Sequence, residues 1–178
     1  MNILLRLAEI RIPGFIRRKK FRALVDLTAR AFGVDTPIFR ARSASSLLSA
    51  YALFTREQAD LALRDGRSAG DVAIRLHQNA AAFGRDLRTS LHISTPGEVM
   101  RAARLLYGTM GIDFRGSDDG NILIGKCAFS DFYESRTCAL ISALDEGLLA
   151  GLAGGGRLEF SERITDGQSR CRARFHSS

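Results

Sequence analysis

Three cysteines carry the clearest chemical signal in this chain. Cys127, Cys138 and Cys171 are its only cysteines, and they are separated by ten and by thirty-two residues. Thiolates are preferred ligands of Zn²⁺, and Glu134 offers a carboxylate as the fourth ligand. The spacing lacks the paired C-x-x-C of a zinc motif, so two interpretations stay open. The thiols either bind zinc or are small buried apolar groups, as free cysteines often are.

Nucleophilic or acid–base catalysis is a second chemistry that these residues suggest. Cys138 is expected near the start of a helix, where the N-terminal dipole favours a thiolate. Asp145 and Glu146 follow in the same predicted helix, and Glu146 is our candidate catalytic carboxylate beside Cys138. Adjacent helical side chains diverge by about 100°, so these two carboxylates cannot act as a paired acid and base. None of the histidines lies near Cys138 in the sequence, so this interpretation lacks an evident base.

Four aromatic residues are candidates for a ligand-binding pocket. Tyr107 lies in a predicted helix, and Phe129, Phe132 and Tyr133 follow Cys127 closely. Aromatic side chains line many small-molecule sites, although they also fill cores. We therefore expect these four to contact an apolar ligand or to pack in the interior.

The cysteines lie in a section that alternates strands with one helix. Residues 112–115 and 121–124 flank a loop rich in turn-forming residues, and 157–164 and 170–176 flank a second such loop. Between the two predicted hairpins, residues 137–152 have the apolar face of a helix that ends at a run of glycines. Alternation along the last strand predicts that Cys171 faces the core.

The preceding section is helical. Apolar residues recur at helical spacing over 15–32, 43–64 and 71–87. A fourth helix is predicted to begin at Thr95, because Thr95-Pro96-Gly97-Glu98 has the pattern of a capping box with proline at the first position.

These elements predict a single α+β domain over residues 1–178. The N-terminal helices would pack on a four-stranded antiparallel sheet of β-β-α-β-β order. Residues 1–33 form a basic helical segment, 34–111 a helical section and 112–178 the section with the cysteines.

Charge is distributed unevenly along the chain. The net charge is +7, and residues 1–30 hold eight basic side chains against two acidic ones. Contact of residues 1–22 with an anionic surface is one use of this cluster, and a solvated helix face is the other. We do not expect nucleic-acid binding, because no helix-turn-helix pattern or interleaved aromatic residue accompanies the basic run.

No apolar run approaches the roughly 20 residues of a membrane span. Arg6, Glu9 and Arg11 interrupt the N-terminal apolar stretch, which does not fit a secretory signal. We therefore expect a cytoplasmic protein.

The C-terminal section resembles the 4-vinyl-reductase domain superfamily. Its members place a cysteine before a Gly-Leu-rich helix and end in a hairpin reading Gly-Asp-x-x-Cys-x-Phe; the similar segments here are Cys138, 147–152 and 167–175. Cys127-Ala128-Phe129 is similar to the Cys-Pro-Phe often found upstream. Gln168 replaces the aspartate of that pattern.

This resemblance implies a small-molecule-binding domain of sensor or carrier type, with an apolar or aromatic ligand and a homodimeric assembly. A structural zinc accompanies the ligand in sensory members, which supply a further cysteine that 159–170 lacks here. The ending and a helix like 72–88 are also similar to L-2-amino-thiazoline-4-carboxylate hydrolases. That second resemblance implies an enzyme that hydrolyses a small cyclic amide or thiazoline, and both implications remain open.

Overall fold

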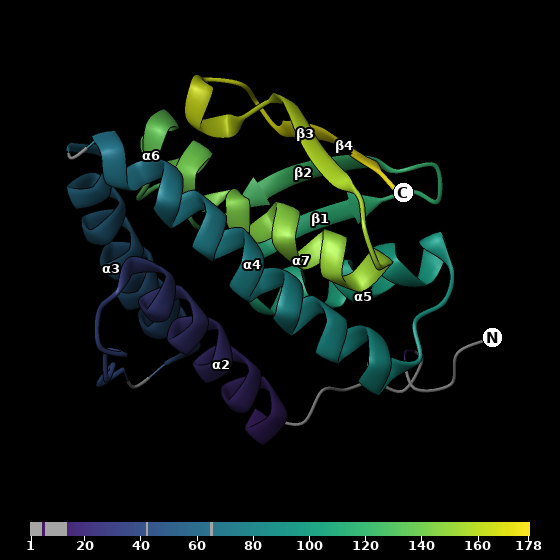
Figure 1. The fold of residues 1–178 in the computed structure, drawn as a ribbon, viewed down its shortest axis with the longest axis horizontal. Coiled ribbons are helices and arrows are strands. Elements are labelled where there is room, and N and C mark those ends of the chain that lie inside the picture. Colours follow the sequence, from purple (N-terminus) through teal and green to yellow (C-terminus); the bar gives the residue numbers. More distant parts are fainter. Residues whose placement is uncertain (1–4, 6–13, 42, 65) are drawn as a thin grey trace.

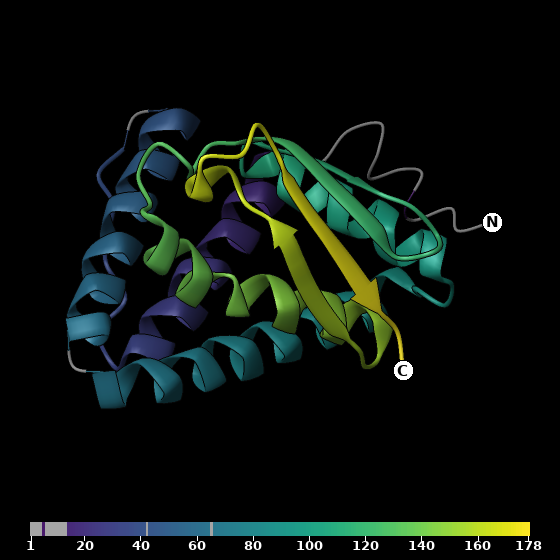
Figure 2. The same ribbon diagram turned by 90° about the horizontal axis from the view of Figure 1, so that it is seen from above.

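The computed structural model describes residue 5 and residues 14–41, 43–64 and 66–178. Helices pack against one face of a four-stranded antiparallel sheet, which confirms the predicted α+β class. Figures 1 and 2 show three helices, α2 (Gly14–Phe32), α3 (Ala44–Arg64) and α4 (Gly66–Leu91), grouped on one side of the molecule and the sheet on the other. Helix α7 (Ala143–Ala153) lies between α4 and the strands. No described helix is both long and apolar enough to cross a membrane.

The predicted helices of the first section are present. They are α2 (Gly14–Phe32), α3 (Ala44–Arg64), α4 (Gly66–Leu91) and α5 (Pro96–Thr109). Helix α4 is longer at both ends than the predicted 71–87. Its N-terminal extension includes Gly70, and one glycine inside a helix costs only about 1 kcal/mol.

The capping box at the start of α5 is confirmed. The Glu98 amide donates to Thr95 Oγ1 at 3.3 Å, and the Thr95 amide donates to Glu98 Oε2 at 3.2 Å. These reciprocal bonds satisfy amides that have no partner within the helix, and they fix its first residue.

The sheet is formed by β1 (Ile112–Gly116), β2 (Asn121–Cys127), β3 (Arg157–Glu162) and β4 (Cys171–His176) in the order β1-β2-β4-β3. Burial alternates along β4, so Cys171 faces inward as predicted. The inward face packs against α5 and α7, and the outward face of β4 is exposed. The sheet therefore has one buried face, as an antiparallel sheet permits.

The single helix predicted over 137–152 is wrong in one respect, because two helices occupy this range. They are α6 (Ser135–Ile141) and α7 (Ala143–Ala153), so two helices, not one, separate β2 from β3. Ser142 marks the break, and its hydroxyl donates to the Ala139 carbonyl at 2.8 Å. Such a local bond competes with the helical pattern. Helix α7 ends at Gly154 with φ of 87°, as the glycine run predicted.

Helices α4 and α7 pack with their backbones in contact, through glycines. A Cβ on Gly147 would lie 2.2 Å from the His77 carbonyl oxygen, and one on Gly151 would lie 2.2 Å from that of Ala81. On α4, a Cβ on Gly84 would lie 2.5 Å from the Leu148 carbonyl oxygen. This contact fixes the rotation of α7 and so decides which of its side chains face the interior.

Candidate functional site

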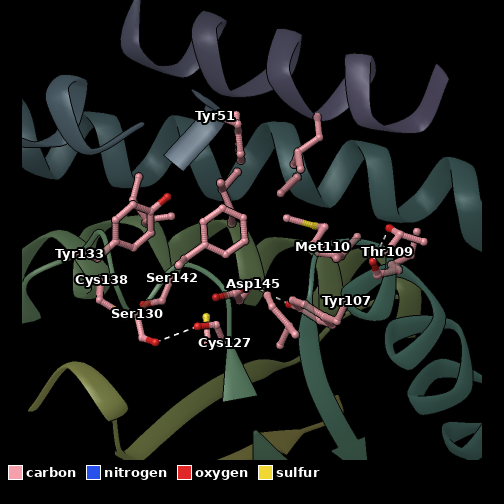
Figure 3. Close-up of a pocket in the computed structure, with 18 of the residues that line it drawn as sticks. Tyr51, Tyr107, Thr109, Met110, Cys127, Ser130, Tyr133, Cys138, Ser142 and Asp145 are labelled. Carbon is pink, nitrogen blue, oxygen red and sulfur yellow. Dashed lines mark hydrogen bonds between the residues drawn. The ribbon is translucent and has the colours of Figure 1, made fainter. Parts of the chain in front are cut away.

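A cavity lies between the helices and the inner end of the sheet. Its volume is about 130 Å³, roughly ten times the space that one water molecule requires. Side chains from α2, α3, α4, α5, α6 and α7 line it, together with the ends of β1, β2 and β4 and the short turn η1 (Ile164–Asp166). Figure 3 shows these side chains around the cavity.

Aromatic rings form much of one wall. The rings of Tyr51 and Phe129 lie 6.1 Å apart, edge to face, and those of Phe129 and Tyr133 are stacked at 5.7 Å. The Tyr51 hydroxyl hydrogen bonds with Thr28 Oγ1 at 2.9 Å, and the Tyr133 hydroxyl bonds with Thr55 Oγ1. Because these hydroxyls have partners in the core, the rings contribute an apolar surface to the cavity.

Three of the four predicted ligand-binding aromatic residues, Tyr107, Phe129 and Tyr133, line this cavity. Phe132 packs against the main core cluster and is not among the lining residues. Tyr51 was not among the predicted site residues. It was visible in the sequence only as one member of the apolar stripe of 43–64, which does not distinguish a cavity wall from a core.

Asp145 is the acidic residue of the cavity. It lies in the first turn of α7, half-buried, and accepts a hydrogen bond from the Tyr107 hydroxyl at 2.7 Å. Desolvation raises the pKa of Asp145 to about 6, although the Tyr107 hydrogen bond and the charge of Arg163 oppose the rise. Glu146, our candidate catalytic carboxylate, is half-buried but does not line the cavity. The structure therefore brings Asp145, and not Glu146, to the site.

All three cysteines line the same cavity. The Ile164 amide donates to Cys171 Sγ at 3.3 Å, and Arg163 Nη1 lies 3.9 Å from Cys138 Sγ. Burial raises the pKa of Cys127 to about 12 and also raises that of Cys171. These two thiols are consequently protonated at neutral pH.

The predicted zinc ligands do not form a coordination group as placed. Among the described residues, no cluster of three or more His, Cys, Asp or Glu side chains is arranged to hold a metal ion. Glu134 is exposed just before α6 and does not line the cavity. Zinc binding by Cys127, Cys138 and Cys171 remains a prediction, which the metal content of untagged protein tests.

Polar side chains gather at the end of the cavity formed by α6, α7 and η1. Arg163 Nη2 donates to Ser142 Oγ at 3.1 Å, and its guanidinium lies 3.9 Å from the centre of the Phe160 ring. Thr165 also lines the cavity, and its buried Oγ1 has no hydrogen-bond partner among the described residues. This end therefore offers polar groups to a bound molecule.

Two predictions about partners remain predictions. Homodimer formation is the first of them. For the anionic-surface contact of residues 1–22, residues 1–4 and 6–13 lie outside the described part of the chain. On α2, the side chains of Arg17, Arg18 and Lys19 are exposed.

Comparison with known proteins gives little further identification. No family model matches this chain, and no curated protein matches it. Among solved structures, it is similar to a trafficking protein particle complex subunit 3 from Naegleria fowleri, covalently bound to palmitic acid. That similarity covers 73% of this chain and 95% of the other, with 14% identity and a TM-score of 0.49. At this level it establishes neither a shared family nor a shared function.

Proposed function

We propose that this protein is a small-molecule-binding domain whose apolar or aromatic ligand lies in the cavity between the helices and the sheet. The observation that carries the proposal is a cavity of about 130 Å³ walled by aromatic rings, with a few polar groups at one end. Small-molecule sites commonly combine these properties, because apolar walls supply affinity and a few polar groups fix orientation.

The energetics of an apolar cavity support the same proposal. Side chains around a void lose the dispersion contacts that a close-packed core would give them. An engineered cavity on the order of 150 Å³, lined by aliphatic and aromatic side chains, binds benzene. A molecule with one aromatic ring would restore contacts to Phe129, Tyr133 and Tyr51 in the present cavity.

A thermal-shift series tests this proposal. We expect at least one of toluene, indole and cyclohexane to raise the melting temperature of the protein with saturable dependence on concentration. Leu106→Trp places a large side chain in the cavity wall, so it should abolish the shift. Ile74→Trp on the exposed face of α4 is the matched control and should retain it, since Ile74 is 56% exposed. Absence of any shift in the folded wild-type protein would overturn the proposal.

A second candidate function is hydrolysis of a small cyclic amide or thiazoline. The observation in its favour is that Cys138 and Asp145 line one cavity, and that the pKa of Asp145, about 6, suits a general acid or base. Turnover of such compounds should then disappear in Cys138→Ala and in Asp145→Asn. Glu146→Gln should retain turnover, because Glu146 lies outside the cavity wall. Equal loss in Glu146→Gln would contradict this assignment.

A further inference from the structure

Asp145 leaves one carboxylate oxygen available to a ligand. Tyr107 donates to Oδ1 at 2.7 Å, and no described residue donates a hydrogen bond to Oδ2. Asp145 is also the only acidic side chain among the described residues that line the cavity. A desolvated carboxylate with an open acceptor is stabilised most by a hydrogen-bond donor that carries positive charge.

Thr165 is a second unsatisfied group at the same cavity. Its hydroxyl oxygen is buried and has no hydrogen-bond partner among the described residues. A buried polar group without a partner costs free energy, which a ligand removes by supplying the partner. Ser142 is not available in this way, because its hydroxyl donates to the Ala139 carbonyl and accepts from Arg163. Among the described residues, Asp145 Oδ2 and the buried Thr165 hydroxyl are therefore two side-chain oxygens at the cavity that remain open to a ligand.

No basic side chain among the described residues contacts Asp145 directly, although the charge of Arg163 lowers its pKa. Arg163 donates to Ser142, lies beside the Cys138 sulfur and stacks on Phe160, and it is not among the cavity-lining residues. Lys20 does line the cavity, but it comes from α2, where its ammonium lies 5.4 Å from the centre of the Phe83 ring. The cavity thus keeps an acceptor that no cation from the described part of the chain occupies.

The aromatic wall suits a cation as well as an apolar group. A cation within roughly 6 Å of an aromatic ring centre is attracted to the ring face. Tyr51, Phe129 and Tyr133 contribute rings to the cavity wall, and Figure 3 shows Tyr51, Tyr133, Tyr107 and Asp145 around one space. An anionic head group would instead be repelled by the Asp145 carboxylate.

We propose that the ligand carries a protonated primary amine on an aromatic or apolar body, with the ammonium group bonded to Asp145 Oδ2 and the body against Phe129 and Tyr133. This inference rests on the proposed small-molecule-binding function and names the chemical class of its ligand. The Thr165 hydroxyl is the second acceptor that the cavity offers to such a ligand.

Three probes that share one ring test the inference: benzylamine, benzyl alcohol and benzoate. Each is titrated at pH 7.5 against the full chain, followed by amide chemical shifts in nuclear magnetic resonance spectra. We expect benzylamine to bind about tenfold or more tightly than benzyl alcohol, as a charged hydrogen bond predicts, and benzoate to bind most weakly. A wild-type protein that binds the three equally, or prefers benzoate, overturns the inference without any variant.

A matched pair of variants locates the preference. Asp145→Asn keeps the shape of the side chain and an acceptor for Tyr107 but removes the charge, so the advantage of benzylamine over benzyl alcohol should disappear. Glu146→Gln removes the neighbouring carboxylate outside the cavity wall and should leave the preference unchanged. An amine preference that survives in Asp145→Asn overturns the inference.

The outcomes separate this inference from the proposed function. Binding of benzyl alcohol and toluene without a preference for benzylamine overturns the amine assignment and leaves the small-molecule-binding function in place. Failure of all these probes to bind the folded wild-type protein overturns both.

Discussion

Helix α7 has two faces that are packed in opposite ways. Toward α4, Gly147 and Gly151 bring the two backbones into contact, and no space remains for even a methyl group. Toward the cavity, Asp145 and Leu148 border open space and, at Asp145, an unused hydrogen-bond acceptor. One helix thus serves as a tightly fitted structural element on one side and as the wall of a site on the other. The close contact therefore positions the helix, and the loosely packed face is where the proposed ligand would gain its contacts.

The largest expected effect comes from filling the close contact. Gly84→Ala would place a Cβ 2.5 Å from the Leu148 carbonyl oxygen, so α4 and α7 must separate. We expect a loss of about 3 kcal/mol or more in the free energy of unfolding, or failure to fold, since overpacking of this kind forces backbone shifts. Urea denaturation followed by circular dichroism measures it.

Gly70→Ala is the matched control in the same helix. A Cβ at Gly70 meets no atom within 4 Å, so the higher helix propensity of alanine should raise stability by about 0.5 to 1 kcal/mol. Equal effects of the two substitutions would show that the α4–α7 contact is not close-packed.

An intermediate effect is expected from the pH dependence of stability on the cavity side. The pKa of Asp145 is about 6 in the folded protein against an ordinary value of 3.8. Between these two pH values the folded state holds a proton that the unfolded state has lost, so the free energy of unfolding falls as pH rises. Above about pH 6 the cost of burying the ionised carboxylate is fully present and constant. Below pH 3.8 the carboxyl group is protonated in both states, and this cost is absent. Asp145→Asn lacks this penalty. The difference in free energy of unfolding, Asp145→Asn minus wild type, should therefore become more positive by on the order of 1 to 3 kcal/mol as pH is raised from 4 to 7.

Urea midpoints for both proteins across this pH range provide the measurement. The other titratable groups are common to both proteins and cancel when the two stabilities are subtracted. Parallel curves would therefore contradict the raised pKa of the Asp145 carboxylate at this site.

The smallest expected effects on stability come from two threonines, one whose hydroxyl is hydrogen-bonded within the protein and one whose hydroxyl is not. Thr55 hydrogen bonds to the Tyr51 and Ala52 carbonyls and to the Tyr133 hydroxyl. Thr55→Val should therefore cost about 1 to 3 kcal/mol, because it leaves a buried hydroxyl without its partner. Thr165→Val should change stability by less than about 0.5 kcal/mol or increase it, since the Thr165 hydroxyl bonds to no described residue. A cost at Thr165 equal to that at Thr55 would show that its hydroxyl is already satisfied.

Features of the fold that depend on residues close together in the sequence were predicted correctly. The capping box at Thr95, the inward face of β4 and the end of α7 at Gly154 all follow from nearby residues, and all are confirmed. The break at Ser142 was not predicted. The Ser142 hydroxyl donates to the nearby Ala139 carbonyl, but it also accepts from Arg163, which lies twenty-one positions further along the chain.

The candidate site was only partly predictable for the same reason. Cys127, Cys138 and Cys171 were expected to meet at one place, and all three line one cavity. The choice between Asp145 and Glu146 depends on the rotation of α7, which contacts with α4 determine through Gly147 and Gly151. Adjacent carboxylates carry no local signal of which one faces inward. Only the packing of two helices distant in the sequence decides it.

Arg163 has a consequence beyond its own contacts. It joins the α6–α7 junction, through Ser142 and Cys138, to β3, through the ring of Phe160. The same residue directly precedes the turn that carries Thr165. A single side chain thus connects the wall of the cavity to the edge strand of the sheet, since Arg163 contacts Cys138 and Ser142 on one side and Phe160 on the other.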